Sequence, residues 1–91
     1  MGSFYLITYS SSIGNAEIIK DRIRQYEDSI NFLDSSWFVY SEDGAEAIYK
    51  KLSKGGFEND RFLVMHVDFS NYWGRLHKSV WEWIKKDRGE K

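Results

Sequence analysis

The chain has 91 residues, neither cysteine nor proline, and a formal net charge of −1. This length fits one domain covering residues 1–91, and a hydrophobic content of 42% excludes a disordered tail. The lack of cysteine excludes disulfides and thiolate metal sites and favours a reducing compartment, so we predict a cytoplasmic protein. The longest apolar runs, 4–7 and 62–65, are far shorter than a membrane span, and the N-terminus lacks a signal-peptide pattern.

Large aromatic rings and an uneven charge distribution set this composition apart. The chain contains 4 Trp, 6 Tyr and 6 Phe, which is more than one small core needs. We therefore expect some rings to lie on a second buried surface, most simply a subunit interface. Residues 1–60 are net acidic, whereas residues 61–91 are net basic. The basic part is either a solvated helix face, whose basic end suits the helix dipole, or a surface that attracts nucleic acid.

The first third of the chain predicts a strand followed by a helix. Residues 3–9 combine β-branched and aromatic side chains without a breaker, and a Ser-rich loop follows over 10–15. The helix is predicted to start near Gly14 or Asn15, with Glu17 placing negative charge in its first turn. Its apolar face is predicted from side chains at helical spacing, which are Ala16, Ile19, Ile23 and Tyr26.

Asp34 and Ser35 interrupt an apolar stretch over residues 30–40. Both residue types favour turns, so we predict a tight hairpin of two short strands. The alternative is a single longer strand with a bulge. It would leave three βα units and favour a small parallel sheet.

A second helix is predicted to begin near Asp43. Asp43 and Glu46 have the spacing of a capping box, and the Gly55-Gly56 pair is predicted to end the helix because glycine adopts the left-handed conformation easily. The apolar stripe of this helix consists of Ala45, Ile48 and Leu52.

The last third predicts a strand over 61–69, a turn over 71–74 and a helix over 75–86. In that helix Leu76, Val80 and Ile84 are in register, and Trp81 and Trp83 flank them.

The order of these elements predicts an α+β fold, a ferredoxin-like βαββαβ sandwich with an extra C-terminal helix. The first and last strands are apolar on both faces. Two crossover helices cover only one face of such a sheet, so the other face needs a cover. We expect the third helix, a second copy of the chain, or both to provide it.

Four polar residues are candidates for a nuclease-like cleft, namely Ser10, Asp34, His66 and Asp68. The loop that begins at Ser10 joins a strand to a helix N-terminus, as phosphate-binding loops do, but it lacks their lysine and glycine pattern, so we favour an ordinary capped connection. Asp34 is interpreted first as a turn residue. His66 and Asp68 share one face of a strand, and we favour a half-buried, hydrogen-bonded His66 over a base or a metal ligand.

The C-terminal third also carries candidates for nucleic-acid binding. Arg75, Lys78, Lys85 and Lys86 could contact phosphates. The rings that could stack on bases are Trp37, Tyr72, Trp73, Trp81 and Trp83. Packing explains the Trp residues at least as well. The histidines lack a third ligand at a characteristic spacing, so we predict neither a metal site nor a cofactor.

Three segments carry a resemblance to a known family. They read FYLITY (4–9), FLDSSWFV (32–39) and FLVMHVDFSNYWG (62–74). They resemble small bacterial proteins described as SinR-like, which look like relatives of the small ferredoxin-fold subunit of the CRISPR spacer-acquisition complex and, more distantly, of the virulence-associated D toxins. The resemblance implies a homodimer packed through the sheets.

The same resemblance bears on catalysis. In the nuclease-like relatives an Asp ends the first strand and is assigned to a metal in the dimer cleft, whereas the matching residue here is Ser10. A neutral hydroxyl does not replace a carboxylate as a ligand for a hard metal. We therefore predict a non-catalytic homodimer, a binding or scaffold module in a nucleic-acid-related or defence-related process, with a protein or a nucleic acid as partner and no membrane association. The alternatives are a metal-dependent nuclease or toxin of the same fold, and a mobile-element-encoded inhibitor of a host defence complex.

Overall fold

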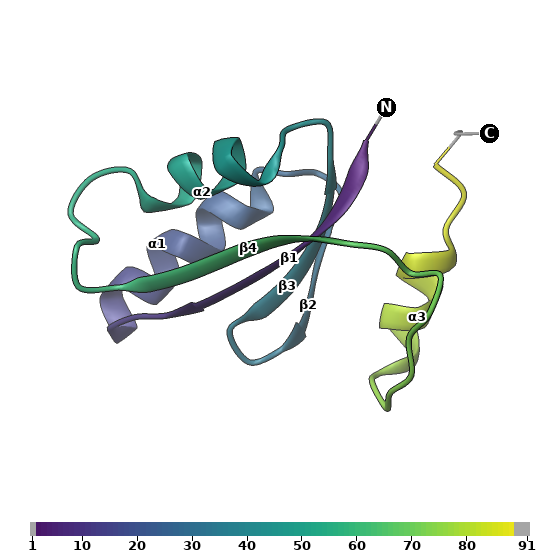
Figure 1. Ribbon diagram of the computed structural model, residues 1–91. Coiled ribbons are helices and arrows are strands. Elements are labelled where there is room, and N and C mark those ends of the chain that lie inside the picture. The colour runs from purple at the N-terminus through teal and green to yellow at the C-terminus, as the bar shows by residue number, and fades with distance from the viewer. Residues whose placement is uncertain (1, 89–91) are drawn as a thin grey trace.

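Four strands and three helices make up the part of the chain that the computed structural model describes, residues 2–88 (Figure 1). The predicted α+β class is confirmed. In chain order the elements are β1 (Ser3–Ser10), α1 (Ile13–Arg24), β2 (Ser29–Leu33), β3 (Ser36–Ser41), α2 (Ala45–Ser53), β4 (Arg61–Val67) and α3 (Lys78–Lys85).

The strands form one antiparallel sheet in the order β2-β3-β1-β4. Helices α1 and α2 lie on one face of this sheet, and α3 lies on the opposite side near one end (Figure 1). We call these the helix face and the second face. The arrangement is compatible with a ferredoxin-like fold.

The hairpin predicted at Asp34-Ser35 is confirmed. β2 and β3 pair antiparallel on either side of these two residues, so the alternative of one long strand and a parallel sheet is wrong. Asp34 has a φ of 27°, a region that Asp tolerates better than most residues. The Asn31 side chain closes the turn by donating to the carbonyl oxygens of Asp34 and Ser36 at 3.0 and 2.9 Å.

The core fills the space between the helix face of the sheet and the helices α1 and α2. The predicted helical stripes point into it, because Ile19 and Ile23 of α1 and Ile48 and Leu52 of α2 are buried. Alternation along each strand supplies the other wall, since successive side chains point to opposite faces. That wall consists of Tyr5, Ile7 and Tyr9 of β1 and Trp37 and Val39 of β3.

The start of α1 differs slightly from its predicted position. The helix begins at Ile13 because the Ser12 side chain caps it, accepting a hydrogen bond from the Asn15 amide at 3.4 Å. Glu17 consequently lies beyond the first turn, which contains no acidic residue.

The predicted capping box of α2 is wrong. Gly44 is the N-cap and makes no side-chain hydrogen bond to the helix. The Asp43 carboxylate instead accepts from the Tyr26 hydroxyl at 3.0 Å, and Glu46 pairs with Lys50. The end is as predicted, because Gly55 and Gly56 follow the helix with φ of 76° and 77°.

The last strand and helix are shorter than predicted. β4 ends at Val67, and the segment from residue 68 to 77 carries no regular helix or strand. α3 begins at Lys78, where His77 caps it by accepting from the Ser79 amide at 3.1 Å. Leu76, predicted as part of the apolar stripe of this helix, therefore precedes it, whereas Val80 and Ile84 lie within it.

Candidate functional site

The four candidates for a nuclease-like cleft lie at opposite ends of the sheet. Ser10 pairs with Arg61 at one end of the antiparallel pair β1–β4, whereas His66 pairs with Tyr5 near the other end. Ser10 follows Tyr5 by five positions of extended strand, so the two residues lie about 17 Å apart along β1. Asp34 lies at the Ser10 end, because the β2–β3 turn follows the Thr8–Ser36 pair.

The candidates at the other end have local roles. The Asp68 carboxylate accepts from the Ser70 amide at 2.9 Å and so closes the turn after β4. His66 faces the helix side, with its ring at 5.5 Å from the Tyr5 ring in an edge-to-face contact. It is exposed rather than half-buried, because β4 is an edge strand and gives it a neighbour on one side only.

One chain therefore does not bring Ser10, Asp34, His66 and Asp68 into a common site. Across residues 2–88, no group of three or more His, Asp or Glu side chains is arranged to hold a metal ion. The helical elements in this range also include none that is long and apolar enough to cross a membrane.

The second face carries an aromatic cluster where α3 packs on the sheet. The Trp83 ring lies 5.7 Å from Phe4 and 6.3 Å from Phe38 between ring centroids. Phe69, which follows β4, contacts both phenylalanines edge to face at 5.0 and 5.1 Å. Of the covers expected for this face, the third helix therefore supplies a part.

Arg88 fastens the end of α3 to the sheet. Its side chain is 8% exposed and donates to the Asp28 carboxylate at 2.7 Å and to the Trp83 carbonyl at 2.7 Å. The guanidinium also lies over the rings of Phe4, Tyr40 and Trp83, at 4.9, 5.1 and 4.5 Å from their centroids.

Asp28 just before β2 is the acidic partner in this contact. Burial alone would raise the pKa of the Asp28 carboxyl, but hydrogen bonds from Arg88 and Lys86 and their positive charges hold that pKa below its usual value. Sequence reasoning missed the pair, because the 60 positions between Asp28 and Arg88 leave no local pattern.

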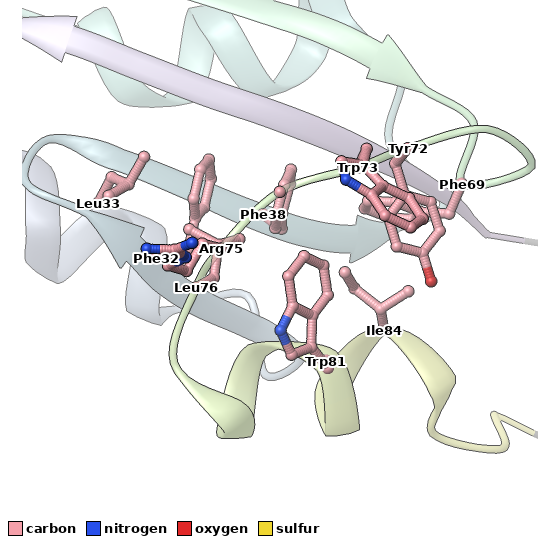
Figure 2. Close-up of a pocket in the computed structure, with 11 residues that line it drawn as sticks. Phe32, Leu33, Phe38, Phe69, Tyr72, Trp73, Arg75, Leu76, Trp81 and Ile84 are labelled. Carbon is pink, nitrogen blue, oxygen red and sulfur yellow. The ribbon is translucent and has the colours of Figure 1, made fainter.

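A hollow of about 350 Å³ opens between the second face, α3 and the segment that joins β4 to α3. Figure 2 shows Trp81 and Ile84 rising from α3 toward side chains of the β2–β3 hairpin, with Trp73 and Arg75 on the connecting segment. Its other lining residues are Phe32, Leu33, Phe38, Phe69, Tyr72, Gly74 and Leu76.

The rings at the rim of this hollow differ in how they are held. Tyr72 stacks on Trp81 with centroids 5.8 Å apart and planes at 20°, and it meets Phe69 edge to face at 5.6 Å. Trp73, in contrast, is 102% exposed. Of the rings predicted as stacking candidates, Trp81 is therefore already partly packed, whereas Trp73 is not.

The four basic candidates separate into two pairs. Lys86 forms an ion pair with Asp28 at 3.1 Å, and Lys78 lies 4.0 Å from Glu82. Arg75 lines the hollow, and Lys85 lines a second hollow of about 320 Å³ beside Trp73 and Trp81. Arg75 and Lys85 are thus the two cations that remain available near the exposed ring.

The second face is left uncovered at the end away from α3. There, two β4 side chains that point to this face, Leu63 and Met65, are 50% and 46% exposed. They lie opposite Thr8 and Leu6 of β1 in the strand register. This surface, Leu6, Leu63 and Met65, is called the β4 patch below.

Comparison of this chain with protein-family models, curated proteins and solved structures gives no match.

Proposed function

We propose that this chain is a non-catalytic binding or scaffold module that acts as a homodimer in a nucleic-acid-related or defence-related process. The observation that carries the proposal is the β4 patch, where Leu63 and Met65 stay half exposed on a face that α3 covers only in part. A second copy that packs there removes these apolar side chains from water, which favours association by roughly 25 cal/mol for each Å² buried.

The finer fold assignment belongs to the same proposal. We assign the chain to the ferredoxin-like class, and two features support this. α1 links β1 to β2, and α2 links β3 to β4, with both helices on one face. β1 and β3 are the inner strands of the antiparallel sheet. These connections correspond to the split βαβ pattern of that class.

The non-catalytic role is supported by the separation of the polar candidates. A general base or a metal site needs its groups within hydrogen-bonding or coordination distance, whereas Ser10 and His66 lie near opposite ends of β1 and its neighbour β4. Asp68 is engaged with the Ser70 amide, and Asp34 lies at the exposed tip of a hairpin.

Light scattering of the purified protein at micromolar concentration tests the dimer. We expect the mass of two chains for the parent protein and of one chain for Met65→Lys, because the lysine would bury its charge in the interface. Ile18→Lys is the matched control, since Ile18 is 45% exposed on α1, away from the second face, and should leave the dimer intact. A monomeric parent protein contradicts the proposal.

A further inference from the structure

Trp73 is a ring whose position packing does not explain. Its side chain is 102% exposed, although neighbouring Tyr72 is held between Phe69 and Trp81. An exposed indole keeps a large apolar surface in contact with water. Rings of this kind are typical of sites where a ligand covers that surface. The residue lies in the connecting segment, where it lines both hollows beside α3.

The two hollows adjoin at this ring. They share Tyr72, Trp73, Gly74 and Trp81, and their volumes are about 350 and 320 Å³. Each volume is at the lower end of the range for small-molecule sites and leaves room for one flat ring. The walls near Trp73 are faces and edges of aromatic rings, and Gly74 adds no side chain to fill the space between them.

The charges around the hollows have one sign. Arg75 lines the first hollow and Lys85 the second, and among the described residues no acidic side chain lines either. Within residues 2–88, neither Arg75 nor Lys85 forms an ion pair. An unneutralised guanidinium and an ammonium group beside exposed ring faces are complementary to a flat apolar group that carries negative charge.

We propose that this surface binds nucleotide units, with a base stacked on Trp73 and its phosphate held by Arg75 or Lys85. Two adjoining hollows, each with one cation, match the repeat of base and phosphate in a single strand. The bases of a duplex are already stacked on one another, so a duplex offers this site only phosphates. The ligand is therefore a single-stranded nucleic acid or a free nucleotide.

This inference extends the proposed binding role and uses a surface different from the β4 patch. Fluorescence anisotropy of a labelled short oligothymidylate at low salt measures the affinity. Trp73→Ala should weaken binding about five-fold or more, because it removes one stacking contact, whereas Trp73→Phe retains a ring and should stay within about two-fold of the parent protein. Competition with unlabelled thymidine monophosphate separates the two sources of the ligand, since only a site for free nucleotides is emptied by the monomer.

The cations are tested by the salt dependence of the same affinity. Two phosphate contacts to a single strand give a slope of log K against log salt of about −1.4. The double variant Arg75→Gln with Lys85→Gln should flatten this slope toward zero. Lys54→Gln is the matched control, because Lys54 is exposed beside Gly55 at the end of α2 and lines neither hollow.

Three results would overturn the nucleotide site. They are an affinity unchanged by Trp73→Ala, equal affinity for duplex and single strand, and no binding of either probe at low salt. Light scattering on the same samples keeps the two proposals apart. Loss of binding with an intact dimer would contradict the nucleotide site alone. A monomer that still binds would contradict the dimer alone.

Discussion

The two faces of the sheet differ in how completely their side chains are buried. On the helix face the fully buried side chains are aliphatic ones such as Ile7, Ile19 and Ile48, and no charged residue within 2–88 is buried there. On the second face aromatic rings meet both edge to face and stacked, and a charged side chain, Arg88, joins the end of α3 to this layer. The layer on the helix face is called the closed layer, because its core residues are buried. The layer on the second face is called the open layer, because hollows remain in it.

This difference separates the layer that mainly stabilises the fold from the layer that keeps hollows. Among the described residues, every buried hydrophobic side chain except Val80 belongs to the core on the helix face, so that face supplies most of the hydrophobic stabilisation. On the second face, in contrast, two hollows open beside Trp73 and Trp81. The layer that contributes less to the core is the layer on which we propose that a ligand binds.

The largest expected effect tests the closed layer. Trp37 is buried on the helix face, so Trp37→Ala should lower the free energy of unfolding by about 3–5 kcal/mol. Trp37→Phe should lower the free energy of unfolding much less, because a smaller aromatic ring still fills part of the site. The substitution also removes the indole Nε1, which has no hydrogen-bond partner within the described range. Urea denaturation measures both values. A mild effect of Trp37→Ala would contradict the conclusion that the helix face is the closely packed layer.

The next effect tests what holds the open layer. Arg88→Gln removes the charge that joins α3 to Asp28 and the contacts with three rings, so we expect a loss of about 2 kcal/mol. Near-ultraviolet circular dichroism should change as Trp83 loses its environment, while the far-ultraviolet spectrum is largely kept. Lys86→Gln is the control, because Lys86 contacts the same carboxylate from a half-exposed position and should cost less than 1 kcal/mol. Equal losses for the two variants would show that charge alone holds the layer.

As the pH falls, the open layer should lose stability before the closed layer does. Because the pKa of Asp28 is lowered in the folded chain, its contribution to stability is fully present above the ordinary carboxyl value of about 3.9. It is lost as the pH falls through the lowered pKa. The stability difference between the parent protein and Asp28→Asn should thus be constant from about pH 5 to 7 and shrink below that. A difference that grows toward low pH would contradict this assignment.

Local patterns were sufficient to predict the closed layer. The spacing of Ile19 and Ile23 predicted the buried face of α1, and Asp34-Ser35 predicted the hairpin, because both depend on neighbouring residues. The capping box at Asp43 failed for a reason that lies far along the chain. The Tyr26 hydroxyl, 17 positions away, donates to the carboxylate that the box would need.

The candidate site was harder to predict, because its parts meet only in the folded chain. Asp34 and Asp68 are ordinary turn residues, and only the strand register shows that they lie at opposite ends of the sheet. The four Trp residues look equivalent in the sequence, yet Trp37 is buried and Trp73 is exposed. Two pieces of information could have separated them. Trp37 lies among alternating strand residues, whereas Trp73 precedes Gly74 in a segment without periodicity.

The smallest expected effect on stability belongs to Trp73. Since its ring is fully exposed, Trp73→Ala should shift the melting temperature by less than about 3 °C, the range of an ordinary surface substitution. Trp37→Ala and Trp73→Ala then change the same residue type in the two layers. We expect a large loss of stability in the closed layer and almost none in the open layer. A thermal denaturation curve followed by far-ultraviolet circular dichroism measures the shift. If Trp73→Ala instead unfolds the chain at much lower temperature, the indole packs against the protein in solution, and the open layer is closed by its own residues rather than by a ligand.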